Sequence, residues 1–233
     1  MKVAVFSDIH GNYEALKTII EDIKINNYDE IICLGDVVGL GPNPKECLDL
    51  IRNNNIILLL GNHELYCIKG TEINEMSSDE KSHHVWVNSQ LTKDDLNYLC
   101  ECKYFYEKKI FDYKLLFEHF LLKDEIYPYM SLNIVKNHEI VNSFNDIKSD
   151  YIFIGHEHES FECDNENGTN LICVGSSGCR KDDSTFYTII DIGSEINITK
   201  KYLNYDREKF EEIFKKVNCP DKDKINKIFF GVK

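Results

Sequence analysis

The chain is poor in basic residues and has no long apolar run. Its 233 residues include 27 Lys and Arg against 40 Asp and Glu, which gives a formal net charge of -13 at pH 7. Broad binding of nucleic acid requires Lys and Arg for phosphate contacts, so we do not expect a nucleic-acid partner. No apolar segment approaches the roughly 20 residues that span a membrane, and the first residues lack the pattern of a signal peptide. We therefore expect a cytoplasmic protein without a membrane partner.

The chain also lacks a disulfide framework and a flexible linker. It has nine cysteines, an odd number, and their spacing is not that of a disulfide framework. Cys33, Cys47 and Cys173 lie in apolar runs and are typical of small core residues, which is consistent with a reducing cytoplasm. We find no internal repeat and no low-complexity segment, and a hydrophobic content of 42% is ample for a core. We interpret residues 1–233 as one domain.

The first sixty residues alternate between strand and helix patterns. Leu16, Ile19, Ile20 and Ile23 have the spacing of a helix with one buried face, and Asn43-Pro44 is typical of a helix start. This alternation predicts right-handed crossovers and a parallel sheet. The expected strands cover residues 2–6, 30–35 and 55–60, and the expected helices cover 13–26 and 44–53.

The rest of the chain changes in character. Residues 65–103 are polar and mostly helical, which predicts a helical insertion that partly covers the ligand end of the sheet. Short alternating patterns over 160–203 predict an antiparallel second sheet. Further expected elements are a hairpin over 104–120 that turns at Asp112-Tyr113, a helix within 131–148, a strand over 150–155 and a closing helix over 210–217; the tail over 220–233 carries no prediction.

Polar residues with metal-binding side chains follow five of the apolar runs. Strands of one sheet bring their ends to one edge, so these residues should form a single cluster. Asp8 and His10 would share one side of an extended segment, as would His156 and His158. The candidate ligands are Asp8, His10, Asp36, Asn62, His119, His156 and His158.

Seven ligands are too many for one zinc ion, which usually takes four. With Asp36 as a bridge, they suit two divalent ions about 3.5–4 Å apart. Oxygen and nitrogen donors together suit Mn, Fe, Co, Ni or Zn better than Mg or Ca, and we expect Mn first.

Together these blocks resemble the signature of the calcineurin-like metallophosphoesterase superfamily. The Gly-Asp-x-Val-Gly-x-Gly-Pro-Asn-Pro sequence at 35–44 is similar to the small bacterial and archaeal, phosphodiesterase-like branch. The resemblance implies an α/β fold, a four-layer α/β/β/α sandwich of two mixed sheets with the helical insertion near the active site. The matching blocks are Asp8-Ile-His10-Gly-Asn, Gly35-Asp36, Gly61-Asn62-His63-Glu64, His119 and Gly155-His156-Glu157-His158.

The resemblance also implies roles for single residues. His63 would protonate the leaving group after attack by a hydroxide between the two metals, and either Glu64 or Asp36 would orient it. Arg180 is a further candidate, as a bidentate ligand of the substrate phosphate. One ion would be held by Asp8, His10, Asp36 and His158, and the other by Asp36, Asn62, His119 and His156.

Three departures from the family pattern leave every candidate ligand in place. Phe120 replaces the usual Gly, Glu157 replaces Thr, and Cys173-Val precedes Gly175-Ser-Ser-Gly178 where Asn-Pro is usual. We therefore expect residues 65–103 and 175–183 to choose the substrate. Leu60 and Val37-Val38 stand where protein Ser/Thr phosphatases carry Arg-containing motifs, which argues against that activity.

The sequence thus predicts a metal-dependent phosphoesterase, a phosphodiesterase or phosphatase, that hydrolyses small phosphomonoesters or phosphodiesters, including nucleotide-derived ones. The alternatives are a non-catalytic metal-binding scaffold of the same fold, which the intact His63 disfavours, and a nuclease, which the negative charge disfavours. His83 and His84 could reach the site from the insertion, but we interpret them as an exposed helix face; we interpret His138 as a solvated side chain. The sequence does not determine the oligomeric state.

Overall fold

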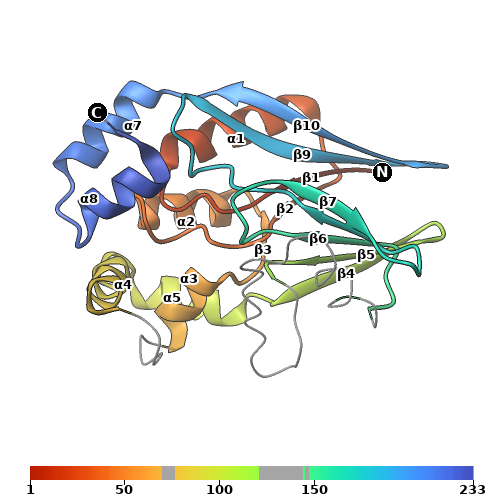
Figure 1. Cartoon of the computed structure of the whole chain (residues 1–233), viewed down its shortest axis with the longest axis horizontal. Coiled ribbons are helices and arrows are strands. Elements are labelled where there is room, and N and C mark those ends of the chain that lie inside the picture. Colours follow the sequence, from red (N-terminus) through yellow and green to blue (C-terminus); the bar gives the residue numbers. More distant parts are fainter. Residues whose placement is uncertain (70–76, 121–143, 145–146, 233) are drawn as a thin grey trace.

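Two mixed sheets of five strands form the centre of the fold in this computed structural model, which describes residues 1–69, 77–120, 144 and 147–232 (Figure 1). The first sheet has the order β10-β9-β1-β2-β3 and the second has the order β4-β5-β6-β8-β7. The expected α/β sandwich of two mixed sheets is therefore confirmed. In the first sheet the strands are β1 (Lys2–Phe6), β2 (Glu30–Cys33), β3 (Ile57–Leu58), β9 (Ser184–Ile192) and β10 (Ile196–Asn204), and in the second they are β4 (Phe105–Ile110), β5 (Tyr113–Glu118), β6 (Tyr151–Ile154), β7 (Phe161–Asp164) and β8 (Asn170–Cys173).

The parallel start of the fold is confirmed, because β1, β2 and β3 pair in parallel. The assignment of residues 160–203 to one antiparallel second sheet was wrong. β7 and β8 do lie in the second sheet, where β8 is parallel to β6. The long hairpin of β9 and β10 instead joins the first sheet, antiparallel to β1. Alternating side chains identify a strand, but the choice of partner depends on which sheet edge remains open.

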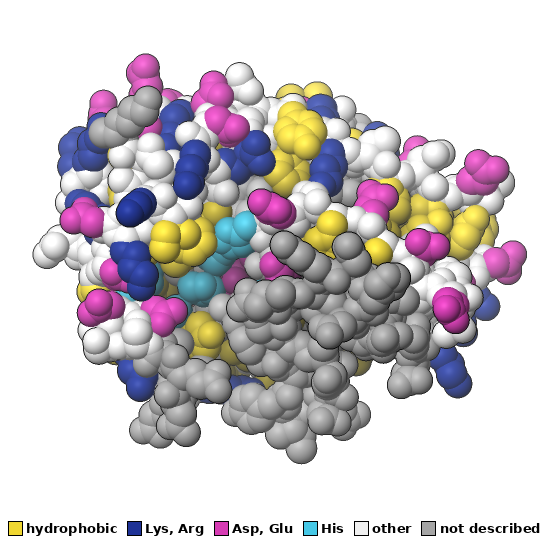
Figure 2. All heavy atoms as spheres, in the orientation of Figure 1, with side chains coloured by type: hydrophobic (Ala, Val, Ile, Leu, Met, Phe, Trp, Pro, Cys, Tyr) yellow, Lys and Arg dark blue, Asp and Glu magenta, His cyan; other side chains and the backbone are white. Residues whose placement is uncertain are grey.

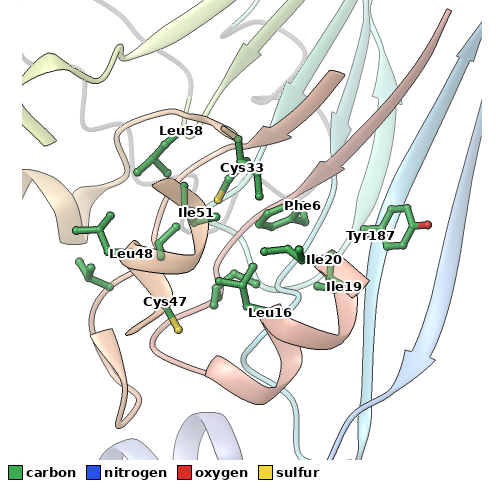
Figure 3. Close-up of a cluster of buried hydrophobic side chains, with 14 of the residues drawn as sticks. Phe6, Leu16, Ile19, Ile20, Cys33, Cys47, Leu48, Ile51, Leu58 and Tyr187 are labelled. Atoms are coloured by element: carbon green, nitrogen blue, oxygen red, sulfur yellow. The ribbon is translucent and has the colours of Figure 1, made fainter. Parts of the chain in front are cut away.

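Side chains of β1 alternate between two cores, as expected for a strand buried on both faces. Val3 and Val5 contact the second sheet, whereas Ala4 and Phe6 contact the helices. Helices α1 (Tyr13–Asn26) and α2 (Pro44–Asn53) cover that outer face (Figure 3). Burying each large aliphatic side chain there contributes about 1.5–3 kcal/mol, so both helices are held firmly on the sheet. The cluster includes Leu16, Ile19, Ile20, Cys47, Leu48 and Ile51.

The insertion after β3 is helical, as predicted. It contains α3 (Asn62–Lys69), α4 (Ser78–Gln90) and α5 (Lys93–Glu101). Ser77 and Thr92 each begin a helix with a capping box, in which the hydroxyl accepts a backbone N–H and a carboxylate three residues later accepts the N–H of the cap. These helices lie beyond the strand ends, beside the C-terminal tail (Figure 1).

The tail packs back onto the body of the protein. Helix α7 (Arg207–Lys216) presents Phe210 and Phe214 to Phe230, with ring centroids 5.1 and 5.3 Å apart. Arg207 Nη2 also donates to the carbonyl of Phe230. These contacts position helix α8 (Lys222–Ile225) and the wider π-helical turn of residues Asn226–Phe230.

Two smaller expectations have separate outcomes. The hairpin turn falls at residues 111–112, because Tyr113 already begins β5. The helix expected within 131–148 lies mostly outside the described residues, and so does His138.

All nine cysteines are free thiols, and Cys33, Cys47 and Cys173 are buried as predicted. Within the described ranges, no helix has both the length and the apolar character needed to cross a membrane.

Candidate metal centre and active site

The predicted ligands meet at one edge of the sandwich, beyond the carboxyl ends of five strands. Asp8 and His10 follow β1, and Asp36 follows β2. Asn62 begins α3 directly after β3, and His119 follows β5. His156 and His158 follow β6. The structure therefore brings all seven side chains into one cluster, from both sheets.

Sharp turns, and not extended segments, place the ligands. The φ angles of Asp8, His10, Asp36 and His156 are 54°, 48°, 52° and 65°. The expectation that Asp8 and His10 share one side of an extended segment was therefore wrong. Non-glycine residues in this left-handed region cost about 1–3 kcal/mol each and persist where their surroundings fix them. Here the backbone N–H of His10 donates to the carbonyl of Asp36 at 2.9 Å, which joins the two turns.

Four donor atoms form a first group. His10 Nε2 lies 3.7 Å from Asp8 Oδ1, 3.6 Å from Asp36 Oδ2 and 3.2 Å from His158 Nε2. His158 Nε2 lies 3.8 Å from Asp8 Oδ1. Donors about 2.0–2.2 Å from one tetrahedral ion are separated by about 3.3–3.6 Å. The spacing of this group is thus close to that of a single coordination shell.

A second group shares an atom with the first. Asp36 Oδ2, which lies 3.6 Å from His10 Nε2, also lies 3.3 Å from His119 Nε2. His156 Nδ1 lies 3.0 Å from Asn62 Oδ1. Donor atoms of Asp36, His119 and His156 all fall within 4.8 Å of one another. One carboxylate oxygen therefore faces two sets of ligands.

Several of these atoms are buried without a hydrogen-bond partner. Asp8 Oδ1 and both ring nitrogens of His119 have none among the described residues. Leaving such groups unsatisfied away from water is costly, whereas a metal ion would satisfy Asp8 Oδ1 and one ring nitrogen of His119. The donor set and its burial thus fit divalent metal ions.

The charges of the cluster depend on one another. Burial opposes ionisation of Asp36, but His119 and His63 outweigh this effect and hold its pKa well below the usual value. Burial likewise lowers the pKa of His119, but Asp36 and Asp8 outweigh it and raise the pKa to about 9. The pKa of His158 falls to about 4, mainly because of its burial. In the metal-free protein, a proton on His119 therefore offsets part of the carboxylate charge.

Glu64 braces the loop that carries Asp36. Its buried carboxylate accepts four backbone N–H groups at 2.8–3.1 Å: those of Asp36, Val37, Val38 and Gly61. Burial raises the pKa of Glu64 to about 7. Asp36 Oδ1 accepts the backbone N–H of His63 at 3.0 Å, which holds the backbone of His63 and not its ring, so the residue that orients the ring stays a prediction.

The ring of His63 lies over the cluster. Its centroid is 4.8 Å from that of His10 and 4.9 Å from that of His84. Burial lowers the pKa of His63 well below the usual value, although Asp36 opposes the shift. Gly39 leaves room for the ring, since a Cβ at that position would lie 2.1 Å from His63 Nδ1.

Residues 175–178 hold the backbone of Asp8 in place by hydrogen bonds. Ser176 Oγ and the backbone N–H of Gly178 both donate to the carbonyl of Asp8, at 2.8 and 3.1 Å. Arg180 turns away from the metal ligands: its Nε donates to Ser184 Oγ at 2.7 Å, and its guanidinium pairs with Asp182. This geometry gives no support to Arg180 as a ligand of the substrate phosphate.

Near the cluster, the sequence-based assignment of two histidines was wrong and one cysteine was missed. The assignment of His83 and His84 to an exposed helix face was wrong, because their side chains are 3% and 5% exposed. His83 contacts the tail, since its Nδ1 lies 3.0 Å from the carbonyl oxygen of Pro220, and the ring centroid of His84 lies 4.5 Å from that of Tyr66. Cys179 places its sulfur within 4.8 Å of the donor atoms of His10 and His158. In the sequence, the position of Cys179 directly after the Gly175–Gly178 block could have indicated that its thiol lies near the ligands.

A cavity of about 660 Å³ opens above the metal ligands. Figure 2 shows histidine side chains at the floor of this hollow, between hydrophobic, basic and acidic side chains. Besides the ligands and His63, its described lining comes from α4, from residues 221–229, and from Leu40, Tyr66, Glu157 and Glu159. Residues 175–183 are not among the lining residues. The tail thus takes the place that the sequence suggested for residues 175–183.

Comparison with known proteins gives matches by sequence and by structure. The sequence matches the family described as calcineurin-like phosphoesterase over residues 1–160. An uncharacterized protein of Methanocaldococcus jannaschii is 33% identical over 174 residues, which are 74% of this chain and 68% of that protein. A symmetrical bis(5'-nucleosyl)-tetraphosphatase of Haemophilus ducreyi is 35% identical over 71 residues, which are 29% of this chain and 26% of that enzyme. A metallophosphoesterase from Sphaerobacter thermophilus has the same fold, with a TM-score of 0.71, 22% identity and coverage of 95% of this chain and 96% of its own.

The family match and the site geometry agree. The matched residues contain the ligand cluster, His63 and Glu64, and they make up more than half of the chain. The clustered ligands follow the strands in the order that the signature blocks require. The chain belongs to the calcineurin-like phosphoesterase family.

Proposed function

We propose that this protein is a two-metal phosphoesterase that hydrolyses small phosphomonoesters or phosphodiesters. The observation that carries the proposal is the position of Asp36 Oδ2, 3.6 Å from His10 Nε2 and 3.3 Å from His119 Nε2. A carboxylate oxygen near two sets of ligands fits a pair of ions.

The residues would divide between two ions. Asp8, His10 and His158 would hold one ion, Asn62, His119 and His156 would hold the other, and Asp36 would bridge them. Mn suits this mixture of oxygen and nitrogen donors, as do Fe, Zn, Co and Ni. When bound, such ions offset the charge of phosphate oxygens and lower the pKa of a coordinated water to about 7.

His63 is the residue that we assign to proton transfer. It lines the cavity beside the ligands, where the oxygen of a leaving group would depart. Burial favours its neutral form, and the negative charge of a bound phosphate would favour proton uptake. His63 would then donate that proton to the leaving-group oxygen, a contribution typically worth 10²–10⁴-fold in rate.

The substrate would include nucleotide-derived esters. The tetraphosphatase of Haemophilus ducreyi, by its name, acts on a molecule with nucleosyl groups, and its similarity to this chain covers 71 residues. This similarity supports a nucleosyl group in the substrate, but it does not support a tetraphosphate. The cavity has the volume for a small organic group in addition to a phosphate.

Replacement of the bridging carboxylate tests the proposal. We expect Asp36→Ala to lose at least half of the bound metal and nearly all hydrolysis of bis-p-nitrophenyl phosphate in Mn. Asp164→Ala, which removes an exposed carboxylate on β7, is the matched control and should keep both. Full metal content and undiminished hydrolysis in Asp36→Ala would refute the two-metal mechanism. Absence of turnover by the unmodified protein, over a panel of esters and metals, would favour a scaffold role.

A further inference from the structure

Two segments that are distant in sequence form two walls of the cavity above the metal ligands. One wall is the start of α4, with Glu80, His83 and His84, and the other is the tail over residues 221–229. Its volume of about 660 Å³ falls within the range of about 300–1,000 Å³ that accommodates organic ligands. A phosphate on the metals would therefore leave most of the cavity for another group.

The tail contributes an apolar surface next to the ligands. Ile228 is 49% exposed although it lines the cavity, and Phe229 is half-buried with its ring centroid 5.3 Å from that of His158. On the opposite wall, His84 is buried, and its Nδ1 has no hydrogen-bond partner within the described chain. These walls offer dispersion contacts to a flat or apolar group, together with ring nitrogens of His83 and His84 that are unpaired among the described residues.

The charged residues around this cavity are mainly acidic. Among the described lining residues outside the ligand set, Lys224 is the one cation, and it lies 3.4 Å from Asp221. Glu80 accepts hydrogen bonds from Ser77 at the start of α4, and the charge of Lys224 acts on it. Glu157 and Glu159 form no ion pair with any of the described residues. A single phosphoryl group on two divalent ions is compatible with this field, but any further phosphate would face the three carboxylates.

We propose that this cavity is a leaving-group subsite for phosphate esters whose leaving group is apolar and uncharged, and that its carboxylates select against substrates with additional phosphates. The inference rests on the proposed phosphoesterase function and names the substrate class of the same site. It separates this chain from an enzyme of dinucleoside polyphosphates, for which extra phosphates would need cations along the cavity.

Steady-state kinetics with two substrates test the selection. We expect kcat/KM for bis-p-nitrophenyl phosphate, an aryl diester with one negative charge, to exceed that for diadenosine tetraphosphate by about tenfold or more. Free Mn must be buffered at one concentration, because polyphosphates bind the metal in solution. A higher kcat/KM for the tetraphosphate would overturn the proposal.

Charge variants identify the cause of the selection. Glu159→Lys should raise the ratio of tetraphosphate to diester kcat/KM by about 3–10-fold, and Lys224→Glu should lower it. Both side chains are exposed, so the fold should tolerate these changes. Glu166→Lys, an equal change at an exposed position outside the cavity, is the matched control and should leave the ratio unchanged. Salt at 0.5 M should reduce the effect of both variants.

The apolar wall has its own test. Phe229→Ala should lower kcat/KM for the aryl diester about tenfold through KM, with the metal content unchanged, and Phe229→Leu should restore part of the loss. Phe111→Ala, at an exposed hairpin tip, controls for the loss of an aromatic ring. An unchanged substrate ratio in both charge variants, or an unchanged KM in Phe229→Ala, would overturn the subsite while hydrolysis itself continues. Failure of the proposed function would instead appear as no turnover of any ester.

Discussion

The Gly39→Ala variant tests whether catalysis depends on the position of the His63 ring when metal binding is unchanged. Gly39 has φ of 89°, and a Cβ there would lie 2.1 Å from Nδ1, 2.8 Å from Cγ and 2.9 Å from Cε1 of His63. Ordinary contact begins at 3.4 Å, so the ring must move by about 1.3 Å from its place over the cluster. A misplacement of about 1 Å can reduce catalysis about 10²-fold.

We therefore expect Gly39→Ala to lower kcat by about 10²-fold, which corresponds to about 2.7 kcal/mol of activation free energy. Gly39 is not a ligand, so the metal content measured by atomic emission should stay at its original value. The residue change also forces alanine into a left-handed conformation, which costs about 1–2 kcal/mol of stability. Urea unfolding would measure that cost separately from the rate.

Gly168→Ala provides the matched control. Gly168 has φ of 81°, but no atom lies within 4 Å of the position of an added Cβ. This variant should show a similar loss of stability with kcat unchanged. If Gly39→Ala kept its full kcat, or if Gly168→Ala lost as much activity, displacement of His63 could not be the cause. Adding Gly39→Ala to His63→Ala should cost little further rate, because both changes affect the same group.

Three further predictions concern the residues around the metals. His63→Ala should keep its metals and lose about 10²–10⁴-fold in kcat for an ester with a poor leaving group; a loss of metal would contradict its assignment to proton transfer. Glu64→Gln should lower the free energy of unfolding by about 2–4 kcal/mol in urea titrations, because the amide NH₂ faces two of the four backbone donors and leaves them unsatisfied; equal stability would show that these bonds contribute little. In the metal-free protein His119 has a pKa of about 9, so it holds a proton at pH 7 that binding of a metal must displace. Metal affinity should therefore rise by up to about tenfold per pH unit from pH 7 to 9, and calorimetry in two buffers at pH 7 should detect proton release; a pH-independent affinity would exclude His119 as a ligand.

The expected elements near the N-terminus follow from local patterns, and the structure agrees with them closely. The spacing of Leu16, Ile19 and Ile20 correctly predicts α1, because apolar residues at this spacing lie on one face of a helix, and that face packs on the sheet. The clustering of Asp8 and Asp36 was also predictable, because parallel neighbours end at one edge.

Other features depend on contacts that no local pattern records. The hairpin of β9 and β10 could pair with either sheet, and its pairing with β1 is a tertiary choice. His83 contacts the tail at the carbonyl oxygen of Pro220, and the tail has no strong periodicity of its own. Glu64 could have oriented His63, but its carboxylate accepts N–H groups from a loop 26 to 28 residues away in sequence.

The sequence by itself determined the chemistry of this protein: its strands, its seven candidate ligands, the histidine beside them and the acidic balance of its surface. These depend on residue identity and on periods of two and 3.6 residues, which are local properties. The tertiary structure decided which walls surround the site, which loop Glu64 braces and which sheet the last hairpin joins. Those outcomes depend on packing between segments that are distant in sequence, and the apolar surface that each contact buries decides which segments pack together.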